Sequence, residues 1–205
     1  MLKIVSTNNQ QEDIQGAKRF YFKAQDALKA GKWIKAIQYL KKSLEINKDY
    51  QPACRDLAEI YHQHGDLEEA QRYIETSLQI NPDDPISLFI QGVIYLTQRD
   101  VQSALKSFNM VLEHGELTWA LAYNLGLCYY SLNNYDFSIQ YLNKAIQKDP
   151  LQAQPYLLLA QIFLIQSKSD MAKEILMRVK KMRPHDRQLH ILLNNILNPQ
   201  NGPRG

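Results

Sequence analysis

The sequence of 205 residues predicts an all-α fold in which five similar helix pairs follow one another along the chain. The evidence is a set of residue series that all keep an interval of 34 residues. One series of small residues contains Ala36, Ala70, Ala104, Ser138 and Ala172, and a second contains Ala24, Ala58, Gly92, Gly126 and Ala160. A series of large apolar residues contains Leu40, Ile74, Phe108, Leu142 and Leu176. Because the series stay in phase without an insertion, they predict a repeat array rather than one irregular domain.

The segment 51–84 shows how one unit is built. Leu57, Ala58 and Tyr61 lie at i, i+1 and i+4, which is one face of a first helix. Gly65 and Asp66 interrupt this pattern. The stripe of the second helix then contains Ala70, Ile74, Ser77 and Leu78. The small residues predict where the two helices cross, since helix axes about 8–10 Å apart leave no room there for a large side chain.

These series resemble the tetratricopeptide repeat, whose pattern is W-x₂-L-G-x₂-Y…A-x₃-F…P. The resemblance implies a right-handed α-solenoid of five helix-turn-helix repeats, at residues 17–50, 51–84, 85–118, 119–152 and 153–186. It also implies that residues 187–197 form an amphipathic helix that caps the last repeat. Residues 1–16 and 198–205 are expected to be an N-terminal tail and a flexible C-terminal tail. The chain departs from the family pattern at its Trp position, which holds Phe20, Cys54, Leu88, Ala122 and Tyr156.

Composition narrows the classes of function. Lys and Arg number 24 against 21 Asp and Glu, so the chain lacks the positive excess typical of a dedicated nucleic-acid binder. The N-terminus has no apolar run of the length that a secretory signal needs. No segment approaches the roughly 20 apolar residues of a membrane-spanning helix. We therefore expect a soluble, cytoplasmic protein with neither nucleic acid nor direct membrane insertion among its interactions.

No arrangement of residues predicts catalysis, a metal site or a cofactor. The glycines are scattered and form no phosphate-binding loop. His62 and His64 are two residues apart, and on a helix they do not share a face. Cys54 and Cys128 belong to different repeats, too far apart for a disulfide, and are expected to be small core residues. The sequence predicts a non-enzymatic protein.

The resemblance also predicts a binding groove, because in this family the first helix of each repeat lines a concave surface. In repeats three to five the residues at these positions are mainly apolar, and a helix that is apolar all round is either buried or has a partner. The predicted groove residues are Phe89, Ile90, Val93, Leu96, Tyr123, Asn124, Leu127, Tyr130 and Leu157. In this hypothesis Tyr123 and Tyr130 give rigid amphipathic contacts, and the Asn124 amide pairs with the ligand backbone.

Two classes of function stay open at this point. The first is an adaptor, assembly factor or chaperone that binds an apolar peptide or helix of another protein. The second is a structural scaffold that self-assembles through its groove or its repeat ends, giving a homo-oligomer. A third, known mode of the family, the clamp for the C-terminal carboxylate of chaperones, is not expected. The equivalent positions from the first repeat are Tyr21, Gln25, Asp56, Ile86 and Ile90, which do not match its Lys and Asn residues.

Charge is distributed unevenly along the chain. Repeat one has nine basic and three acidic residues, whereas repeat two has two basic and eight acidic residues. The basic surface includes Lys18, Arg19, Lys23, Lys29, Lys32, Lys35, Lys41 and Lys42, and the residues singled out for docking are Lys18, Arg19 and Lys29. It is either an ordinary solvated surface or an electrostatic docking patch, for an acidic partner or for repeat two of another copy.

Overall fold

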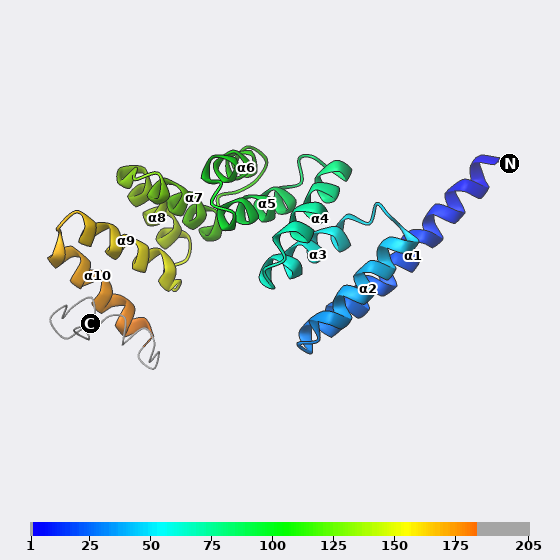
Figure 1. Ribbon diagram of the computed structural model, residues 1–205, viewed down its shortest axis with the longest axis horizontal. Coiled ribbons are helices and arrows are strands. Elements are labelled where there is room, and N and C mark those ends of the chain that lie inside the picture. The colour runs from blue at the N-terminus through cyan, green and yellow to red at the C-terminus, as the bar shows by residue number, and fades with distance from the viewer. Residues whose placement is uncertain (1, 184–205) are drawn as a thin grey trace. The chain divides into compact units, whose positions relative to one another are not determined.

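The computed structural model describes the backbone of residues 2–183 and the side chains from Glu12 onward. Over this range the chain forms ten α-helices and no strands, which confirms the predicted all-α fold (Figure 1). The helices are α1 (Leu2–Lys29), α2 (Trp33–Ile46), α3 (Gln51–Gln63), α4 (Leu67–Ile80), α5 (Pro85–Thr97), α6 (Val101–His114), α7 (Trp119–Ser131), α8 (Tyr135–Lys148), α9 (Ala153–Ile165) and α10 (Ser169–Met182).

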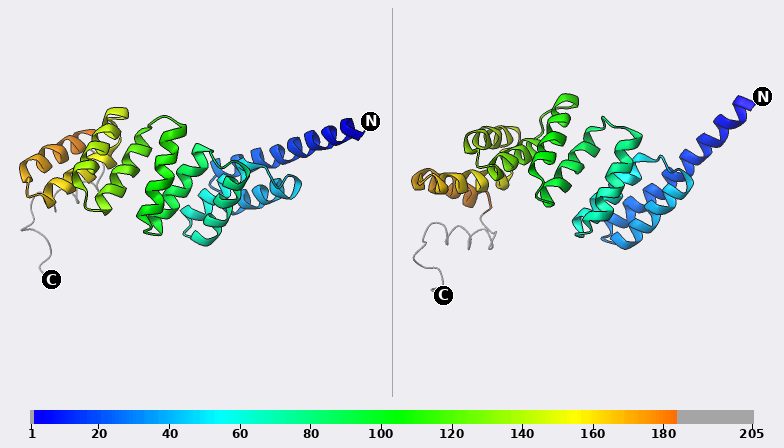
Figure 2. Two further views of the ribbon diagram at one scale, coloured as in Figure 1. Left: turned by 90° about the horizontal axis from the view of Figure 1, so that it is seen from above. Right: turned by 45° about the horizontal axis from the view of Figure 1, so that its top comes forward.

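The helices group into two compact units, which we describe separately. Unit 1 extends to Glu116 and contains α1 to α6, and unit 2 begins at Leu117 and contains α7 to α10. Within each unit, every odd-numbered helix packs most extensively against the helix that follows it, as the hairpins in Figure 2 show. Each unit thus consists of helix pairs, three in unit 1 and two in unit 2.

The first helix is longer than expected. Residues 2–16 were expected to be a tail, but α1 begins at Leu2 and is 28 residues long, twice the length of α2. The segment contains no proline that would stop a helix, and the part of α1 that packs on α2 supplies a stable helix from which it extends. The predicted capping helix 187–197 and the predicted tail 198–205 lie outside the described residues.

Each helix pair turns at a residue with left-handed backbone conformation. The φ angles there are positive at Gly31 (69°), Gly65 (81°), Arg99 (64°), Asn133 (57°) and Ser167 (59°), which are again 34 residues apart. This conformation ends a helix by turning its last carbonyls toward backbone N–H groups beyond it. Only two of the five positions hold glycine, which adopts this conformation without steric cost.

The small residues lie at helix crossings, as their spacing predicts. A Cβ atom on Gly92 would lie 2.5 Å from the Phe108 ring, and one on Gly126 would lie 3.0 Å from Leu142. Phe108 and Leu142 are both fully buried. The periodic small residues therefore permit the close approach of α5 to α6 and of α7 to α8.

Candidate functional site

In unit 1, the first helices of repeats one and two are joined by a partly buried polar cluster. The Gln25 side chain of α1 donates a hydrogen bond to the Asp56 carboxylate of α3, and the Tyr21 hydroxyl also bonds to that carboxylate. Burial raises the pKa of Asp56 to about 6, with a further rise from Glu59, against the lowering effect of its donors. Burial and the Asp56 charge raise the pKa of Tyr21 to about 12. The cluster therefore ties repeat one to repeat two.

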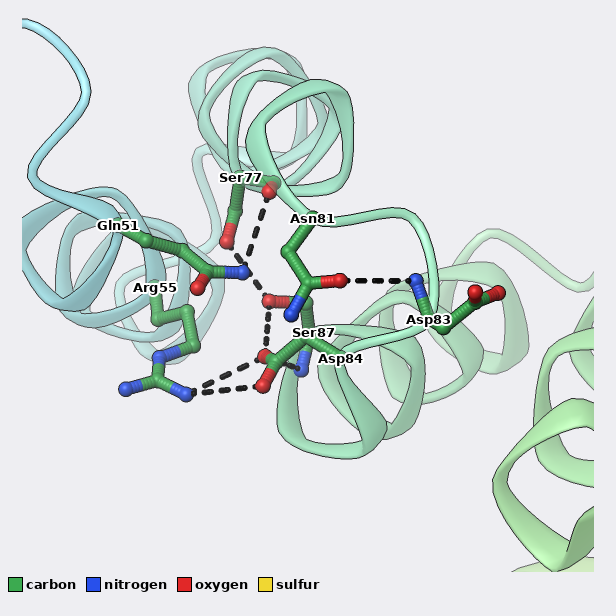
Figure 3. Close-up of polar contacts among 7 residues, drawn as sticks. All are labelled: Gln51, Arg55, Ser77, Asn81, Asp83, Asp84 and Ser87. Atoms are coloured by element: carbon green, nitrogen blue, oxygen red, sulfur yellow. Dashed lines mark hydrogen bonds and ion pairs between the residues drawn. The ribbon is translucent and has the colours of Figure 1, made fainter. Parts of the chain in front are cut away.

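A second cluster joins repeats two and three (Figure 3). The Arg55 guanidinium lies 3.2 Å and 3.3 Å from the two carboxylate oxygens of Asp84. Asp84 also caps α5, accepting bonds from the Ser87 backbone N–H at 2.8 Å and the Ser87 hydroxyl at 2.6 Å. Burial alone would raise the pKa of Asp84, but the Ser87 donors and Arg55 together lower it.

The Arg55 cluster continues into the interior of unit 1. The hydroxyls of Ser77 and Ser87 are 2.7 Å apart, and both serines are buried. Gln51 donates to the Ser77 carbonyl at 3.2 Å, so four helix and turn segments meet in one network (Figure 3). A third bridge lies between His62 and Thr97, whose side chains are 2.7 Å apart, and burial lowers the pKa of His62. The polar residues of α3 therefore bind neighbouring repeats of the chain itself.

The predicted groove residues of repeat three lie on α5 in unit 1. Phe89, Ile90, Val93 and Leu96 are all half-buried. The Phe89 ring packs on the ring of the buried Phe108 at 5.7 Å between centroids, and Ile90 packs against the core of unit 1. Phe89 and Ile90 thus pack on buried residues, and all four side chains keep part of their apolar surface accessible.

The other predicted groove residues lie in unit 2, on α7 and α9. Tyr123, Leu127, Tyr130 and Leu157 are half-buried and pack against its buried core. Burial raises the pKa of Tyr123. The Tyr130 hydroxyl accepts a bond of 2.7 Å from Gln161, which joins the two helices at this surface. Five of the predicted groove residues therefore lie on α7 and α9 of unit 2. The other four lie on α5 of unit 1.

The side chain of Asn124 bonds to its own helix. Its side-chain amide donates a 2.9 Å hydrogen bond to the Ala120 carbonyl one turn earlier in α7. An amide bonded to its own helix has one fewer donor available for the backbone of a ligand. The pairing of the Asn124 amide with a ligand backbone stays a prediction, with one of its two N–H groups used within α7.

The predicted docking residues Lys18, Arg19 and Lys29 are exposed on α1. The Lys18 ammonium lies 5.8 Å from the centroid of the Phe22 ring, and Phe22 is 54% exposed. The predicted basic surface also includes Lys23, Lys35 and Lys42, and the structure places these three lysines around two rings on α1 and α2, which the sequence did not indicate. Sequence reasoning missed the Arg55 to Asp84 contact, because residues 29 positions apart show no pairing signal in a single sequence.

Within residues 12–183, no group of three or more His, Cys, Asp or Glu side chains is arranged to hold a metal ion. Cys54 and Cys128 are free and buried, and burial raises their thiol pKa values to about 11 and about 12. Both cysteines are therefore protonated core residues at neutral pH. In the part of the chain that the structure describes, no helix combines the length and apolar character needed to span a membrane.

The repeat register, the left-handed turns and the helix pairs define a class of helical repeat proteins. Models of the tetratricopeptide repeat match residues 27–87, 120–150 and 153–186. The chain therefore belongs to the tetratricopeptide repeat family, as its 34-residue series predict, and the predicted α-solenoid class is confirmed.

Similar proteins share this fold at low sequence identity. MamA from Desulfovibrio magneticus RS-1 matches with a TM-score of 0.73 and 21% identity over 83% of this chain and 97% of the other. PilW, described as a widely conserved type IV pilus biogenesis factor, matches with a TM-score of 0.80 and 15% identity over 88% of this chain and 86% of the other. The BBSome complex member BBS4 of Bos taurus is 23% identical over 132 residues, which is 63% of this chain and 25% of BBS4. The chain thus spans about a quarter of the length of this curated relative.

Proposed function

We propose that the chain is a non-enzymatic adaptor or assembly factor that binds an apolar segment of another protein on the first helices of its later repeats. Its membership of the tetratricopeptide family supports a protein-interaction module in general. The observation that supports the specific surface is the set of side chains on α7 and α9. Tyr123, Leu127 and Leu157 are half-buried on a rigid core, so a partner that covers them removes further apolar surface from water without ordering them first.

The geometry of this surface favours a peptide segment as the ligand. Tyr130 and Gln161 hold α7 and α9 together through one hydrogen bond, and both side chains offer polar groups beside the apolar ones. A mixture of apolar and polar groups suits an amphipathic helix or an extended strand, whose backbone needs bonding partners. The similar proteins include a pilus biogenesis factor and a complex member, which supports a role in assembly for this chain as well.

Selection from a random peptide display library tests this proposal directly. We expect the full chain to enrich peptides with apolar residues at helical or alternating spacing. An enriched peptide, synthesised and labelled, should lose at least about tenfold affinity for the double variant Tyr123→Gln and Leu127→Gln. The matched control is Gln140→Ala with Gln147→Ala, two exposed positions of α8.

Circular dichroism of each variant establishes that helicity is unchanged. Equal affinity of the peptide for the wild type and the Tyr123/Leu127 variant would refute the proposed surface. If the molecular mass rises with protein concentration and the same variant abolishes this rise, the result would instead support the scaffold function, in which a second copy occupies this surface.

A further inference from the structure

A cluster of rings and lysines occupies the outer surface of the first helix pair. Phe20 of α1 and Tyr39 of α2 pack with their ring centroids 6.4 Å apart. The Lys23 ammonium lies 5.1 Å from the Phe20 centroid and 6.0 Å from that of Tyr39. Lys42 lies 6.0 Å from the Phe20 centroid and Lys35 lies 5.8 Å from that of Tyr39. We call these five residues the lysine–ring patch. It joins two helices and is independent of the groove proposed above.

The repeat register shows that this patch departs from the other repeats. The residues one, three and four repeats after Lys23 are Leu57, Leu125 and Leu159, and each of them is buried, whereas repeat three holds the half-buried Gln91. In repeat five, Leu159 faces residues of the preceding helix α8, in a hollow that Asn143 and Ile146 also line. At the same position of repeat one, Lys23 is exposed. The α1–α2 pair lies at one end of unit 1 (Figure 1), and Lys23 occupies the position at which Leu159 of repeat five meets residues of the preceding helix.

The charges of the patch are not neutralised by the neighbouring carboxylates. In residues 12–183 the recorded ion pairs are Arg55 with Asp84, Arg72 with Glu69 and His114 with Asp83, and none of them involves a lysine of α1 or α2. The described part of the same helices carries four acidic residues, and none of them forms one of these ion pairs: Glu12, Asp13, Asp26 and Glu45. By contrast, the neighbouring Lys41 has a raised pKa because it bonds to Tyr61, with Glu69 nearby, in repeat two. The three patch lysines keep their charge available to a ligand.

We propose that the lysine–ring patch binds a short acidic segment of a partner protein. The rings hold the lysine side chains beside apolar surface, so an acidic segment would gain carboxylate contacts and apolar contact together. The acidic charge of repeat two limits how long a negatively charged ligand can be, because this repeat follows directly along the chain and carries eight acidic residues. A long polyanion or an anionic membrane surface would approach these carboxylates, whereas a short peptide on α1 and α2 avoids them.

End-to-end association of two copies is disfavoured by the same charges. Helix α10, in the last described pair, carries Lys173, Arg178, Lys180 and Lys181 against Asp170 and Glu174. Contact of this pair with the patch of a second copy would bring like charges together. An acidic segment from a different protein has no such penalty, and it is the ligand that we assign to the patch. Repeat two of a second copy, which carries eight acidic residues, is the competing occupant. A molecular mass that rises with protein concentration and falls at high salt would overturn the assignment in its favour.

Fluorescence anisotropy with the full chain tests the proposal. The probe is a labelled short peptide of alternating glutamate and alanine, and the neutral probe carries glutamine at each glutamate position. We expect binding of the acidic probe only, weakening as salt rises from about 0.05 to about 0.3 M because the Debye length shortens. The double variant Lys23→Glu and Lys42→Glu should weaken binding by about tenfold or more.

The matched control makes the same change of net charge elsewhere. Lys106→Glu with Lys148→Glu alters exposed lysines of α6 and α8, and it should retain at least about half of the wild-type affinity if the patch is the site. Failure of the wild type to bind the acidic probe, or equal losses in both double variants, would overturn the proposal. Tighter binding of single-stranded DNA or of phosphatidylserine vesicles than of the peptide would also overturn it, in favour of a polyanion or a membrane. Circular dichroism checks the fold of each variant.

Discussion

Helix α3 in unit 1 and helix α7 in unit 2 carry different kinds of side chain at equivalent positions of the repeat. Arg55 in repeat two corresponds to Tyr123 in repeat four, two repeats later in the register. Arg55 is engaged with Asp84, which caps the first helix of the next repeat, whereas Tyr123 packs on the core and keeps part of its apolar surface accessible. One backbone repeat can therefore carry either internal polar bridges or an apolar surface, according to the residues at a few positions.

The largest difference between the units is expected at the glycines of the helix crossings. Gly92→Ala in unit 1 should lower the free energy of unfolding by about 2–3 kcal/mol, because its Cβ would overlap the buried Phe108 ring. Gly126→Ala in unit 2 should cost less than about 1 kcal/mol, because its contact with Leu142 is longer and alanine favours helix. Urea unfolding of both variants measures the difference, and a larger loss for Gly126→Ala would contradict the packing described here.

The next effect concerns the helix caps Asp84 and Thr118, the last residues of repeats two and three, which cap the first helices of the repeats that follow. Asp84→Ala should cost about 2 kcal/mol, since it removes the cap of α5 and leaves the partly buried Arg55 without its carboxylate. Thr118→Ala removes only the bond to the Leu121 N–H and should cost about 1 kcal/mol or less. Equal losses in thermal unfolding would show that the Arg55 bridge contributes nothing to stability.

A smaller effect depends on pH and on Asp56. Its pKa is about 6 in the folded chain and about 3.9 in an unfolded chain, so the folded state holds this proton more tightly. The free energy of unfolding should therefore gain about 1 kcal/mol from this group as pH falls from about 7 to about 5. Asp56→Asn should remove that gain. Urea midpoints of both proteins at the two pH values measure it, and an unchanged pH dependence in the variant would assign the effect to another group.

The smallest effect is a gain in stability at the turns. Arg99→Gly in unit 1 and Ser167→Gly in unit 2 should each raise stability by about 0.5–1 kcal/mol, because glycine relieves the cost of their positive φ angles. Gly31→Ala should lower stability by a similar amount, because alanine is strained at the φ angle of 69°. Nothing lies within 4 Å of its Cβ position, so a steric clash does not add to this cost. Differential scanning calorimetry would detect these shifts, and a loss for Arg99→Gly would disprove the strain argument.

Much of the fold was predictable because its determinants are local and repeated. The series of small and large residues predicted helix pairs, and Gly92 against Phe108 shows the contact that this pattern requires. The sequence did not predict the helical continuation of α1 through residues 2–16, since a segment without strong periodicity gives no signal for or against extension of a helix. The groove residues stay a prediction, and the structure adds that they are half-buried and that Asn124 bonds to its own helix.

By itself the sequence determined the repeat register, the helix pairs and the family, because each depends on spacings within and between identical intervals. The tertiary structure decided which polar side chains meet, such as Gln25 with Asp56 and Arg55 with Asp84. It also decided that Phe20 and Tyr39 gather three lysines on one surface. The physical reason is that these contacts join residues from separate helices, and their distances depend on how the helices cross rather than on any local pattern.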